Sequence, residues 1–336
     1  MNLDQRIHSF LLLAKKLKSL DVEKKESLYS KAYIHNAWFT KENIDLAFEG
    51  LFRYLDEDKL IKWLEPYIQK VTDPKTVGVV MAGNIPMVGI HDFLTVLMSG
   101  HKLQAKLSAK DEVLIRFIAD MLYEIDPTYK DYIQFDDRLQ GYDAVIATGS
   151  DNTARYFEYY FSKVPHIIRK NRTSVAILSG KENLEDLKLL ADDVLQYFGM
   201  GCRNIAKIYI PESMQPEILL PAFQKYERIT DHHKYANNYY YNRSIFLVNQ
   251  TPHIDSGFLL LQKNPNLVSP LSVLYYENYK TTKDLKLQLS SYEEKIQCVI
   301  SENSWYPKSL PFGKAQKPEV WDYADHVDTM DFLMNL

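Results

Sequence analysis

The chain of 336 residues contains only two cysteines, Cys202 and Cys298, and neither belongs to a CxxC pair. This scarcity argues against a disulfide framework and against a zinc knuckle. The nine histidines are scattered, and the adjacent pair His232 and His233 is poorly spaced to supply two ligands from one helix face. We therefore expect no metal site.

An excess of basic residues and long apolar runs are also missing. The formal net charge is −4 and no basic face is clustered, so we expect no nucleic-acid partner. No stretch approaches the ~20 apolar residues of a membrane span, and the charged N-terminus lacks the apolar core of a signal peptide. We expect a cytoplasmic protein of about two globular domains, in which a lone thiol persists.

Hydrophobic periodicity predicts a helical N-terminal part followed by α/β units. Helices are expected over 1–20 and 41–70, and the apolar run 76–82 is typical of a strand buried in a parallel sheet. The turn Gly83-Asn84-Ile85-Pro86 leads into a helix through Leu97, with Pro86 in its first turn. Further strands at 102–107 and 143–148, each followed by a helix (the first at 111–123), indicate an open, doubly wound, parallel-type sheet.

A second α/β set follows, in which a strand at 174–180 and a helix at 183–198 precede Cys202. The expected elements after it are a helix at 214–226, an irregular tyrosine-rich loop at 235–243, strands at 244–249, 257–262 and 271–276, a helix at 282–291 and a strand at 295–300. The predicted domains are a helical region 1–70, a cofactor-binding domain 71–175, a catalytic domain 176–305 and a C-terminal packing segment 306–336.

Cys202 lies between a predicted helix and a predicted strand and follows two glycines, Gly199 and Gly201. This pattern predicts a tight turn, on which a thiol can project as a nucleophile while nearby N–H groups face a developing oxyanion. A cysteine in this context can equally be a small buried hydrophobe, which the local pattern alone favours.

Small and polar residues follow several predicted strands at their carboxyl ends, where the ligand crevice of an open α/β sheet forms. They are Asn84, Lys106, Ser108, Gly149 and Ser150. Such residues suit a nucleotide, since they allow close approach and supply charge and a helix N-terminus for phosphate. There is no GxGxxG motif. Simpler roles stay open: Asn84 as a turn residue, Lys106 as a solvated lysine and Ser150 as a helix cap.

These segments, in this order, resemble motifs of the aldehyde dehydrogenase superfamily, and within it the long-chain acyl-CoA reductases of the bioluminescence fatty acid reductase family. Asn84-Ile85-Pro86 is similar to the Asn-x-Pro turn, and Lys106-Leu107-Ser108 to the Lys-Pro-Ser strand. Thr148-Gly149-Ser150 is similar to the Thr-Gly-Ser turn, Gly199-Met200-Gly201-Cys202 to the Gly-x-x-Cys segment, and Ser269-Pro270-Leu271 to the Phe-Gly-Pro-Val segment.

The resemblance implies an aldehyde-dehydrogenase-like α/β fold with a cofactor domain and a second, catalytic α/β domain. It implies Cys202 as the nucleophile and Asn84 as an oxyanion donor. It also implies that Lys106, Ser108, Gly149 and Ser150 contact the cofactor.

Three departures from the family pattern refine this expectation. The segment 167–172 carries no glutamate to activate water, which favours reduction of a thioacyl-enzyme over its hydrolysis. Its Arg169, Lys170 and Arg172 are expected to be a solvated charge run, with contact to cofactor or CoA phosphates as the alternative.

The acid that binds the cofactor ribose in NAD-preferring relatives is replaced by Ala109, and Lys110 follows it. A missing carboxylate and an added cation suit the 2′-phosphate of NADPH. Asn266 stands where the family usually has a glutamate.

The sequence thus predicts NADPH-dependent reduction of a fatty acyl thioester to an aldehyde through Cys202. The alternatives are a short-chain CoA-acylating aldehyde dehydrogenase and a non-catalytic scaffold subunit of this fold. The expected substrate partner is acyl-CoA or another acyl thioester. The expected protein partner is a second copy of this chain, in a homo-oligomer, or an acyl-transferring protein.

Overall fold

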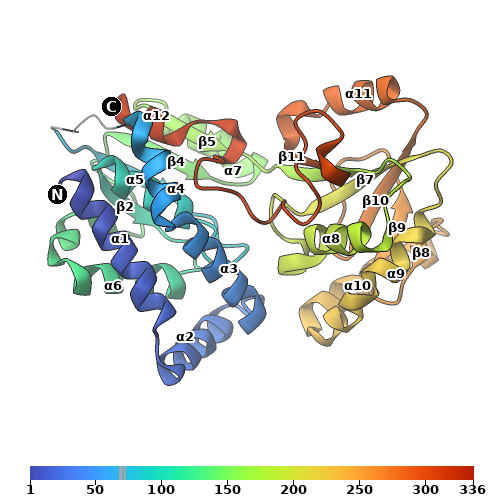
Figure 1. Cartoon of the computed structure of the whole chain (residues 1–336), viewed down its shortest axis with the longest axis horizontal. Helices are drawn as coiled ribbons and strands as arrows, with labels where there is room; N and C mark the ends of the chain where they lie inside the picture. Colours follow the sequence, from blue (N-terminus) through green and yellow to red (C-terminus); the bar gives the residue numbers. More distant parts are fainter. Residues whose placement is uncertain (68–70, 72) are drawn as a thin grey trace. The chain divides into compact units, whose positions relative to one another are not determined.

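The computed structural model describes residues 1–67, 71 and 73–336, which form two compact units (Figure 1). The first unit comprises Met1–Asn171 and Glu319–Leu336, and the second comprises Arg172–Pro318. The chain therefore passes between units after residues 171 and 318, whereas the sequence predicted boundaries after 70, 175 and 305. The functions assigned to those segments stay predictions.

A five-stranded parallel sheet forms the centre of the first unit, in the order β3-β2-β1-β4-β5. Its strands are β1 (Thr76–Val80), β2 (Lys102–Lys106), β3 (Ile133–Phe135), β4 (Ala144–Thr148) and β5 (His166–Arg169). Val79 pairs with Ala105 on one side and with Ile146 on the other, and all three are fully buried. The predicted strands β1, β2 and β4 are confirmed, whereas the edge strands β3 and β5 were not predicted.

Helices α5 (Ile90–Ser99), α6 (Val113–Ile125) and α7 (Asp151–Phe161) connect these strands. The crossovers through α5 and α6 run toward β3, and the crossover through α7 runs toward β5. Because such crossovers are right-handed, α7 covers the opposite face of the sheet, so the sheet is doubly wound as predicted. Helix α5 begins four residues after Pro86, so the prediction that Pro86 lies in its first turn was wrong.

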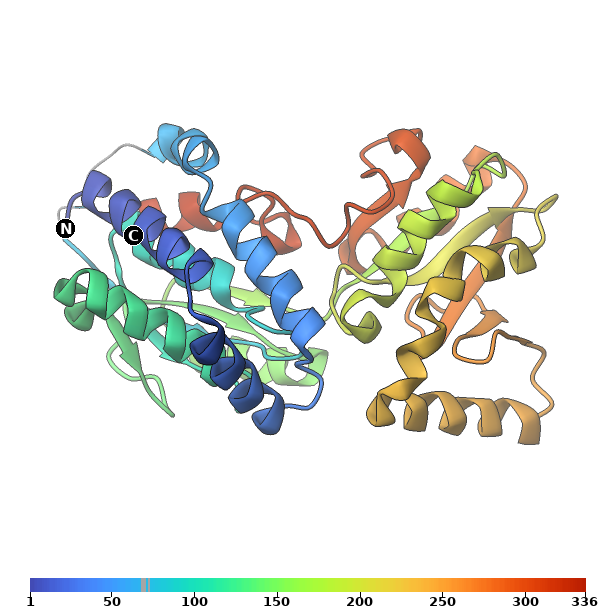
Figure 2. The same cartoon turned by 60° about the horizontal axis from the view of Figure 1, so that its bottom comes forward.

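The helices before the sheet are α1 (Leu3–Lys18), α2 (Val22–His35), α3 (Lys41–Tyr54) and α4 (Glu57–Leu64). Figure 2 shows α1 lying beside α6, and the two helices are in contact. The single helix predicted over 41–70 is interrupted at Leu55, because Asp56 caps the start of α4. Residues 68–70 of that prediction lie outside the described residues, and helix α2 was not predicted.

The second unit has a six-stranded sheet in the order β11-β6-β7-β10-β9-β8, parallel except for β8. Its strands are β6 (Thr173–Ile177), β7 (Ile205–Pro211), β8 (Ile254–Asp255), β9 (Leu260–Lys263), β10 (Val273–Tyr279) and β11 (Ile296–Ser301). Helix α8 (Leu184–Leu195) links β6 to β7, while α11 (Thr282–Ser290) links β10 back to β11 at the other edge. The opposite crossover directions place α8 and α11 on opposite faces.

The tyrosine-rich segment predicted as an irregular loop is helical, since α10 spans His233–Val248. The strand predicted over 244–249 was therefore also wrong. Tyr235, Tyr239, Asn242 and Phe246 are buried, and their spacing of three or four residues places them on one side of the helix. Tyrosines thus supply the apolar stripe that leucines supply elsewhere.

The remaining short elements complete both units. They are η1 (Glu65–Tyr67), η2 (Pro127–Asp131), η3 (Gln196–Gly199), η4 (Pro216–Leu219), α9 (Leu220–Phe223), η5 (Gln224–Asp231), η6 (Glu293–Lys295), η7 (Glu302–Ser304), η8 (Ala324–His326) and α12 (Thr329–Met334). Helix α12 packs on α5. Among the described residues, no helix has the length and apolar character needed to cross a membrane.

Candidate active site

In the first unit, the sequence-predicted cofactor residues follow the three central strands. Asn84 follows β1, Lys106 ends β2 and Ser108 follows it, and the pair Gly149 and Ser150 follows β4. Since β2, β1 and β4 are adjacent and parallel, these residues lie at one edge of the sheet. The fold therefore gathers them where an open α/β sheet binds ligands.

The loops after β1 and β2 are in close contact at Gly83. A Cβ atom on Gly83 would lie 2.6 Å from both Cβ and Oγ of Ser108, so no larger side chain fits without movement. Asp111 connects the same loops, because its Oδ2 accepts a hydrogen bond of 2.6 Å from the Met87 backbone N–H. Burial raises the pKa of Asp111 to about 7, although the Met87 hydrogen bond opposes that rise. Asp111 thus holds the turn that carries Asn84.

The loop after β2 is also fixed by the end of helix α2, which sequence reasoning missed. A ring nitrogen of His35 lies 2.6 Å from the Ala109 carbonyl oxygen, and the Asn36 amide donates to the Lys110 carbonyl at 3.2 Å. Both carbonyls are thereby engaged, while the side chains of Ala109 and Lys110 are exposed. Lys106 is exposed and donates to the Asp137 carbonyl at 2.6 Å.

Ser150 caps helix α7, because its Oγ accepts a hydrogen bond of 3.2 Å from the Thr153 N–H. The capping role that the sequence left open is therefore present. A Cβ on Gly149 would lie 2.9 Å from Phe157 and 3.0 Å from Thr153, so the turn requires glycine. This turn places a small residue directly before the start of a helix, as phosphate binding requires.

Arg169 is not solvated, which corrects the prediction of a charge run. It ends strand β5 and is buried, and its Nη1 donates to Asp92 Oδ2 at 2.5 Å. Its Nη2 donates to the Thr329 hydroxyl at 2.9 Å. The guanidinium therefore ties β5, α5 and the start of α12 together inside the first unit.

In the second unit, Cys202 lies on a β-turn, as predicted. The Asn204 N–H donates to the Gly201 carbonyl at 3.0 Å, which makes Cys202 and Arg203 the central residues of the turn. Cys202 is exposed, so the alternative of a buried hydrophobe is wrong. The turn follows an unusual helix end, where Tyr197 and Phe198 have φ values of 52° and 59°. Left-handed conformations cost non-glycine residues roughly 1–2 kcal/mol each, so surrounding contacts must hold this segment.

Several of those contacts come from Asn204, a buried residue that sequence reasoning missed. Its side-chain oxygen accepts from the Gly201 N–H at 2.7 Å. Its amide nitrogen lies within donor distance of the carbonyls of Asp193, Val194 and Gln196, at 3.1, 3.3 and 2.9 Å. On the strand side, the Ser174 hydroxyl donates to the Cys202 carbonyl at 3.0 Å.

Cys298 differs from Cys202 in environment. It is partly buried in β11, its sulfur lies 3.1 Å from Ser174 Oγ, and burial raises the pKa of its thiol to about 11. A thiol with a raised pKa is a poor nucleophile because the thiolate is the reactive form. Of the two cysteines, only Cys202 therefore has the exposure that nucleophilic chemistry needs.

The β9–β10 loop carries Asn266, which is exposed. This loop is anchored by Lys207, a fully buried lysine whose Nζ donates to the Pro265 carbonyl at 2.8 Å and pairs with Glu277. The structure provides no carboxylate at position 266 itself.

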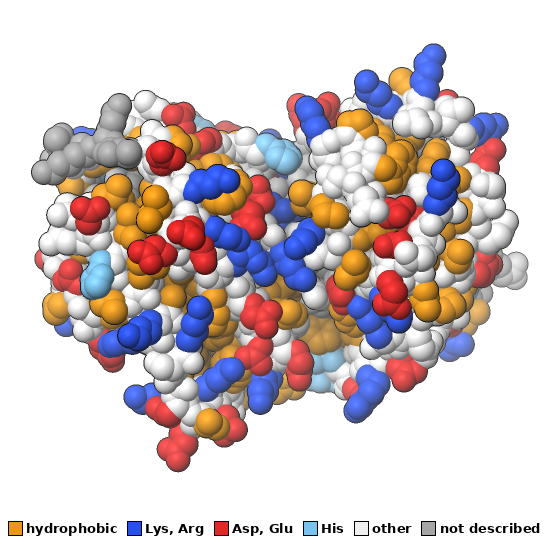
Figure 3. Space-filling model, in the orientation of Figure 1, with side chains coloured by type: hydrophobic (Ala, Val, Ile, Leu, Met, Phe, Trp, Pro, Cys, Tyr) orange, Lys and Arg blue, Asp and Glu red, His pale blue; other side chains and the backbone are white. Residues whose placement is uncertain are grey.

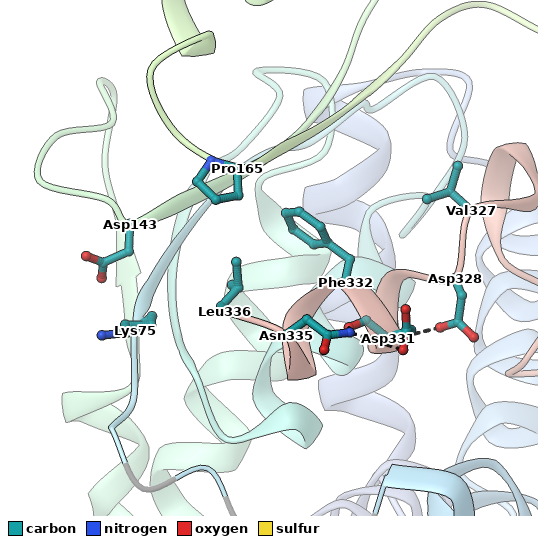
Figure 4. Close-up of a pocket in the computed structure, with 9 residues that line it drawn as sticks. All are labelled: Lys75, Asp143, Pro165, Val327, Asp328, Asp331, Phe332, Asn335 and Leu336. Atoms are coloured by element: carbon teal, nitrogen blue, oxygen red, sulfur yellow. Dashed lines mark hydrogen bonds between the residues drawn. The ribbon is translucent and has the colours of Figure 1, made fainter.

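A cavity of about 720 Å³ lies at the opposite edge of the first sheet, beside the beginnings of β1, β4 and β5 (Figure 4). Lys75 and Asp143 flank it on the strand side, while Phe332 and Leu336 lie on the side of α12 and the C-terminus. None of the sequence-predicted site residues lines this cavity. The cavity lies between the beginnings of these strands and the C-terminal segment that contains α12.

The surface carries charges of both signs, interspersed over each unit on the face drawn in Figure 3. Among residues 1–67, 71 and 73–336, no group of three or more His, Cys, Asp or Glu side chains is placed to hold a metal ion.

No protein-family model matches the sequence, and a search of curated proteins finds no match. Solved structures do match. An aldehyde dehydrogenase from Mycobacterium tuberculosis complexed with NAD+ matches with a TM-score of 0.66 and 12% sequence identity. The match covers 94% of this chain and 76% of that protein's chain. An aldehyde dehydrogenase from Bacillus cereus, also an NAD+ complex, matches with a TM-score of 0.64 and 12% sequence identity. This match covers 90% of this chain and 72% of that protein's chain.

A third match is a variant of an aldehyde dehydrogenase from Pseudomonas syringae in complex with NAD+ and octanal. Its TM-score is 0.63 at 10% identity, and the match covers 89% of this chain and 71% of that one. The chain therefore has an aldehyde-dehydrogenase-like α/β fold. At these identities the likeness concerns the fold.

Proposed function

We propose that this chain is an oxidoreductase that reduces a fatty acyl thioester to an aldehyde, with NADPH as the cofactor and Cys202 as the nucleophile. The observation that carries the proposal is the exposed thiol on the tight turn 201–204. The fold supports an aldehyde-related oxidoreductase, since neighbours of the same fold are aldehyde dehydrogenases in complex with NAD+. The direction of the reaction, the thioester and NADPH are inferences from the residues.

The first unit offers a suitable place for a nicotinamide dinucleotide. Gly83 allows the close approach of Ser108, and Gly149 allows that of Thr153 and Phe157, so both turns at the carboxyl edge of the parallel sheet are tightly packed. Ser108, Ser150 and Lys106 supply hydroxyl groups and a positive charge at the same edge of the sheet. When bound there, the cofactor supplies the hydride for the reduction.

The chain's own residues perform the acyl transfer in this mechanism. The Cys202 thiolate attacks the thioester carbonyl, and the Asn84 side-chain amide stabilises the oxyanion by donating a hydrogen bond. The carbon–sulfur bond to the carrier thiol then breaks, which leaves a thioacyl group on Cys202 and releases the carrier thiolate. After reduction to a hemithioacetal, the bond to Cys202 breaks, the aldehyde leaves and the thiolate is regenerated.

Water must be kept from acting on the thioacyl group. A hydrolytic enzyme needs a base to activate water. The segment 167–172 contains no carboxylate, and Arg169 within it is occupied by Asp92. The residues at this position therefore favour reduction over oxidation of an aldehyde to an acid.

The nucleophile is tested by a single-turnover experiment with long-chain acyl-CoA and no cofactor. Mass spectrometry should find one acyl group on Cys202, and NADPH should discharge it as aldehyde. Cys202→Ala should show no adduct, whereas the matched variant Cys298→Ala should acylate like the wild type because Cys298 is only partly exposed and its thiol has a raised pKa. An adduct that NADPH leaves in place would exclude the reductase, and a faster reaction with acetyl-CoA would favour a short-chain enzyme.

The choice of NADPH is tested at the loop after β2. Lys110 is exposed there, and Ala109 offers no carboxylate to repel a 2′-phosphate. Lys110→Glu should weaken NADPH binding at least about tenfold, as expected for replacing an attractive charge by a repulsive one, and should change NADH binding much less. Fluorescence titration of both cofactors measures this. Equal weakening of NADPH and NADH, or tighter binding of NADH by the wild type, would contradict the assignment.

A further inference from the structure

Asn204 uses every polar group it has, and all but its backbone carbonyl bind within the segment that presents Cys202. Its backbone N–H donates to the Gly201 carbonyl at 3.0 Å, and its own carbonyl accepts from the Ser174 N–H at 3.4 Å. Its side-chain oxygen accepts from the Gly201 N–H at 2.7 Å. The residue therefore binds both sides of Gly201, the residue directly before the thiol.

The amide nitrogen of Asn204 serves the other end of the segment. The last carbonyls of an α-helix have no partner within the helix. Asn204 Nδ2 donates to the Asp193, Val194 and Gln196 carbonyls at the end of α8, at distances of 2.9 to 3.3 Å. Two N–H bonds serve three acceptors, so at least one is shared. One buried side chain thus joins the end of helix α8 to the turn of Cys202.

The segment between these two anchor points needs such support. Tyr197, Phe198 and Gly199 have consecutive positive φ values of 52°, 59° and 79°. A left-handed run of this kind is disfavoured for residues with a Cβ atom and persists only where contacts enforce it. The side-chain amide of Asn204 binds the chain on both sides of this run, at the Gln196 carbonyl before it and at the Gly201 N–H after it.

We infer that Asn204 is a positioning residue for the nucleophile: its side-chain amide fixes the Cys202 turn against helix α8, so that the thiol is held in one orientation toward an acyl carbonyl. This inference rests on the proposed function of Cys202 as a nucleophile. No other side chain of similar size combines an acceptor for Gly201 with a donor for the helix carbonyls, because aspartate lacks the donor and glutamine is one methylene longer.

The chain offers a matched control at the other end of the same helix. The side chain of Asn183 caps the start of α8 by accepting from the N–H groups of Glu185 and Asp186 at 2.8 and 3.0 Å. Asn183→Ala removes an asparagine cap from α8 without touching the Cys202 turn. Any effect of general weakening of α8 will therefore appear in both variants.

The orientation of the thiol is measured directly by ¹⁹F NMR of the full chain after Cys202 is alkylated with bromotrifluoroacetone, with labelling at Cys202 checked by mass spectrometry. Wild type and Asn183→Ala should each give one narrow resonance. Asn204→Ala should give several resonances or one broad resonance, and Asn204→Asp should resemble it because the donor is lost.

The same variants are compared in acyl-enzyme formation from long-chain acyl-CoA. Asn204→Ala should slow this step about 100-fold, since a misplacement of about 1 Å can cost that much, while Asn183→Ala stays within about threefold of the wild type. A single narrow resonance for Asn204→Ala, or equal heterogeneity in Asn183→Ala, would overturn the inference. If neither the wild type nor any variant forms an acyl-enzyme, the proposed reaction fails. The inference about Asn204 still holds in that case, provided that the resonance splits only in the Asn204 variants.

Discussion

Asp193 is a carboxyl group that the second unit keeps away from water. It is 1% exposed and accepts hydrogen bonds from the Gly313 and Ala315 N–H groups at 2.6 and 3.0 Å. Burial raises its pKa to about 7, and the two hydrogen bonds oppose that rise. The residue therefore changes its charge near neutral pH, while it holds the segment around Gly313 against helix α8.

This raised pKa has a defined effect on stability. Between the unfolded pKa of about 4 and the folded pKa of about 7, the folded state binds a proton that the unfolded state has lost. The contribution of Asp193 to stability is therefore complete below a pH of about 4 and declines as the pH rises to about 7. The amide side chain introduced by Asp193→Asn does not titrate in this range.

We expect the free energy of unfolding of the wild type to fall relative to that of Asp193→Asn as the pH rises from about 4 to about 7, by on the order of 1 kcal/mol per pH unit. Urea titrations of both proteins at several pH values across this range measure the difference. The comparison cancels the titration of all other groups. A difference that is constant over this range would show that Asp193 ionises equally in both states.

Strand β5 and helices α5 and α12 are held together by one buried ion pair. Arg169 at the end of β5 contacts Asp92 in the first turn of α5, and Thr329 begins α12. Side-chain exposures of Arg169 and Asp92 are 6% and 9%. A buried charge that loses its partner keeps the cost of desolvation without the compensating attraction.

Arg169→Met should therefore lower the free energy of unfolding of the first unit by about 3–5 kcal/mol. The double variant Arg169→Met/Asp92→Leu should recover much of that loss, because no isolated charge remains. Lys16→Met removes the exposed pair with Glu124 and serves as the control, with an effect below about 1 kcal/mol. Urea unfolding measures all three. A loss in Arg169→Met no larger than in Lys16→Met would show that the pair contributes little.

Over the whole molecule, each unit has its own sheet and its own buried core. The first unit is discontinuous in sequence, because Glu319–Leu336 returns to it after the second unit is complete. Val320, Met330 and Leu333 of this segment are fully buried in the first core. Both chain ends lie on the first unit (Figure 1).

The fragment 172–318 should accordingly fold alone and unfold cooperatively in urea, since its sheet is complete. The fragment 1–171 should be markedly less stable than a permuted chain in which 319–336 is joined by a linker to residue 1. Burying three apolar side chains contributes roughly 1.5–3 kcal/mol each. Circular dichroism during urea titration measures this. Equal stability of 1–171 with and without the C-terminal segment would contradict the prediction.

Local patterns in the chain were enough to predict much of this fold and part of the site. The central strands β1 and β4 are apolar runs followed by small or polar residues, so both their burial and the position of Asn84 follow from the local sequence. The glycines before Cys202 likewise predict its turn. Such features are local, because they depend on a few neighbouring residues and on the φ values that glycine permits.

Long-range contacts decided the rest. The sequence around Arg169 resembles a solvated charge run, and only the approach of Asp92 from another strand–helix unit makes its burial favourable. The segment 235–246 became helical because tyrosines could bury one side against the second sheet. Asn204 is a different case, because the partners of its side chain lie only 3 to 11 residues away in sequence. They come together through the left-handed segment 197–199, which no local pattern predicted. Desolvation of polar groups depends on partners distant in sequence, and the tertiary structure alone supplies them.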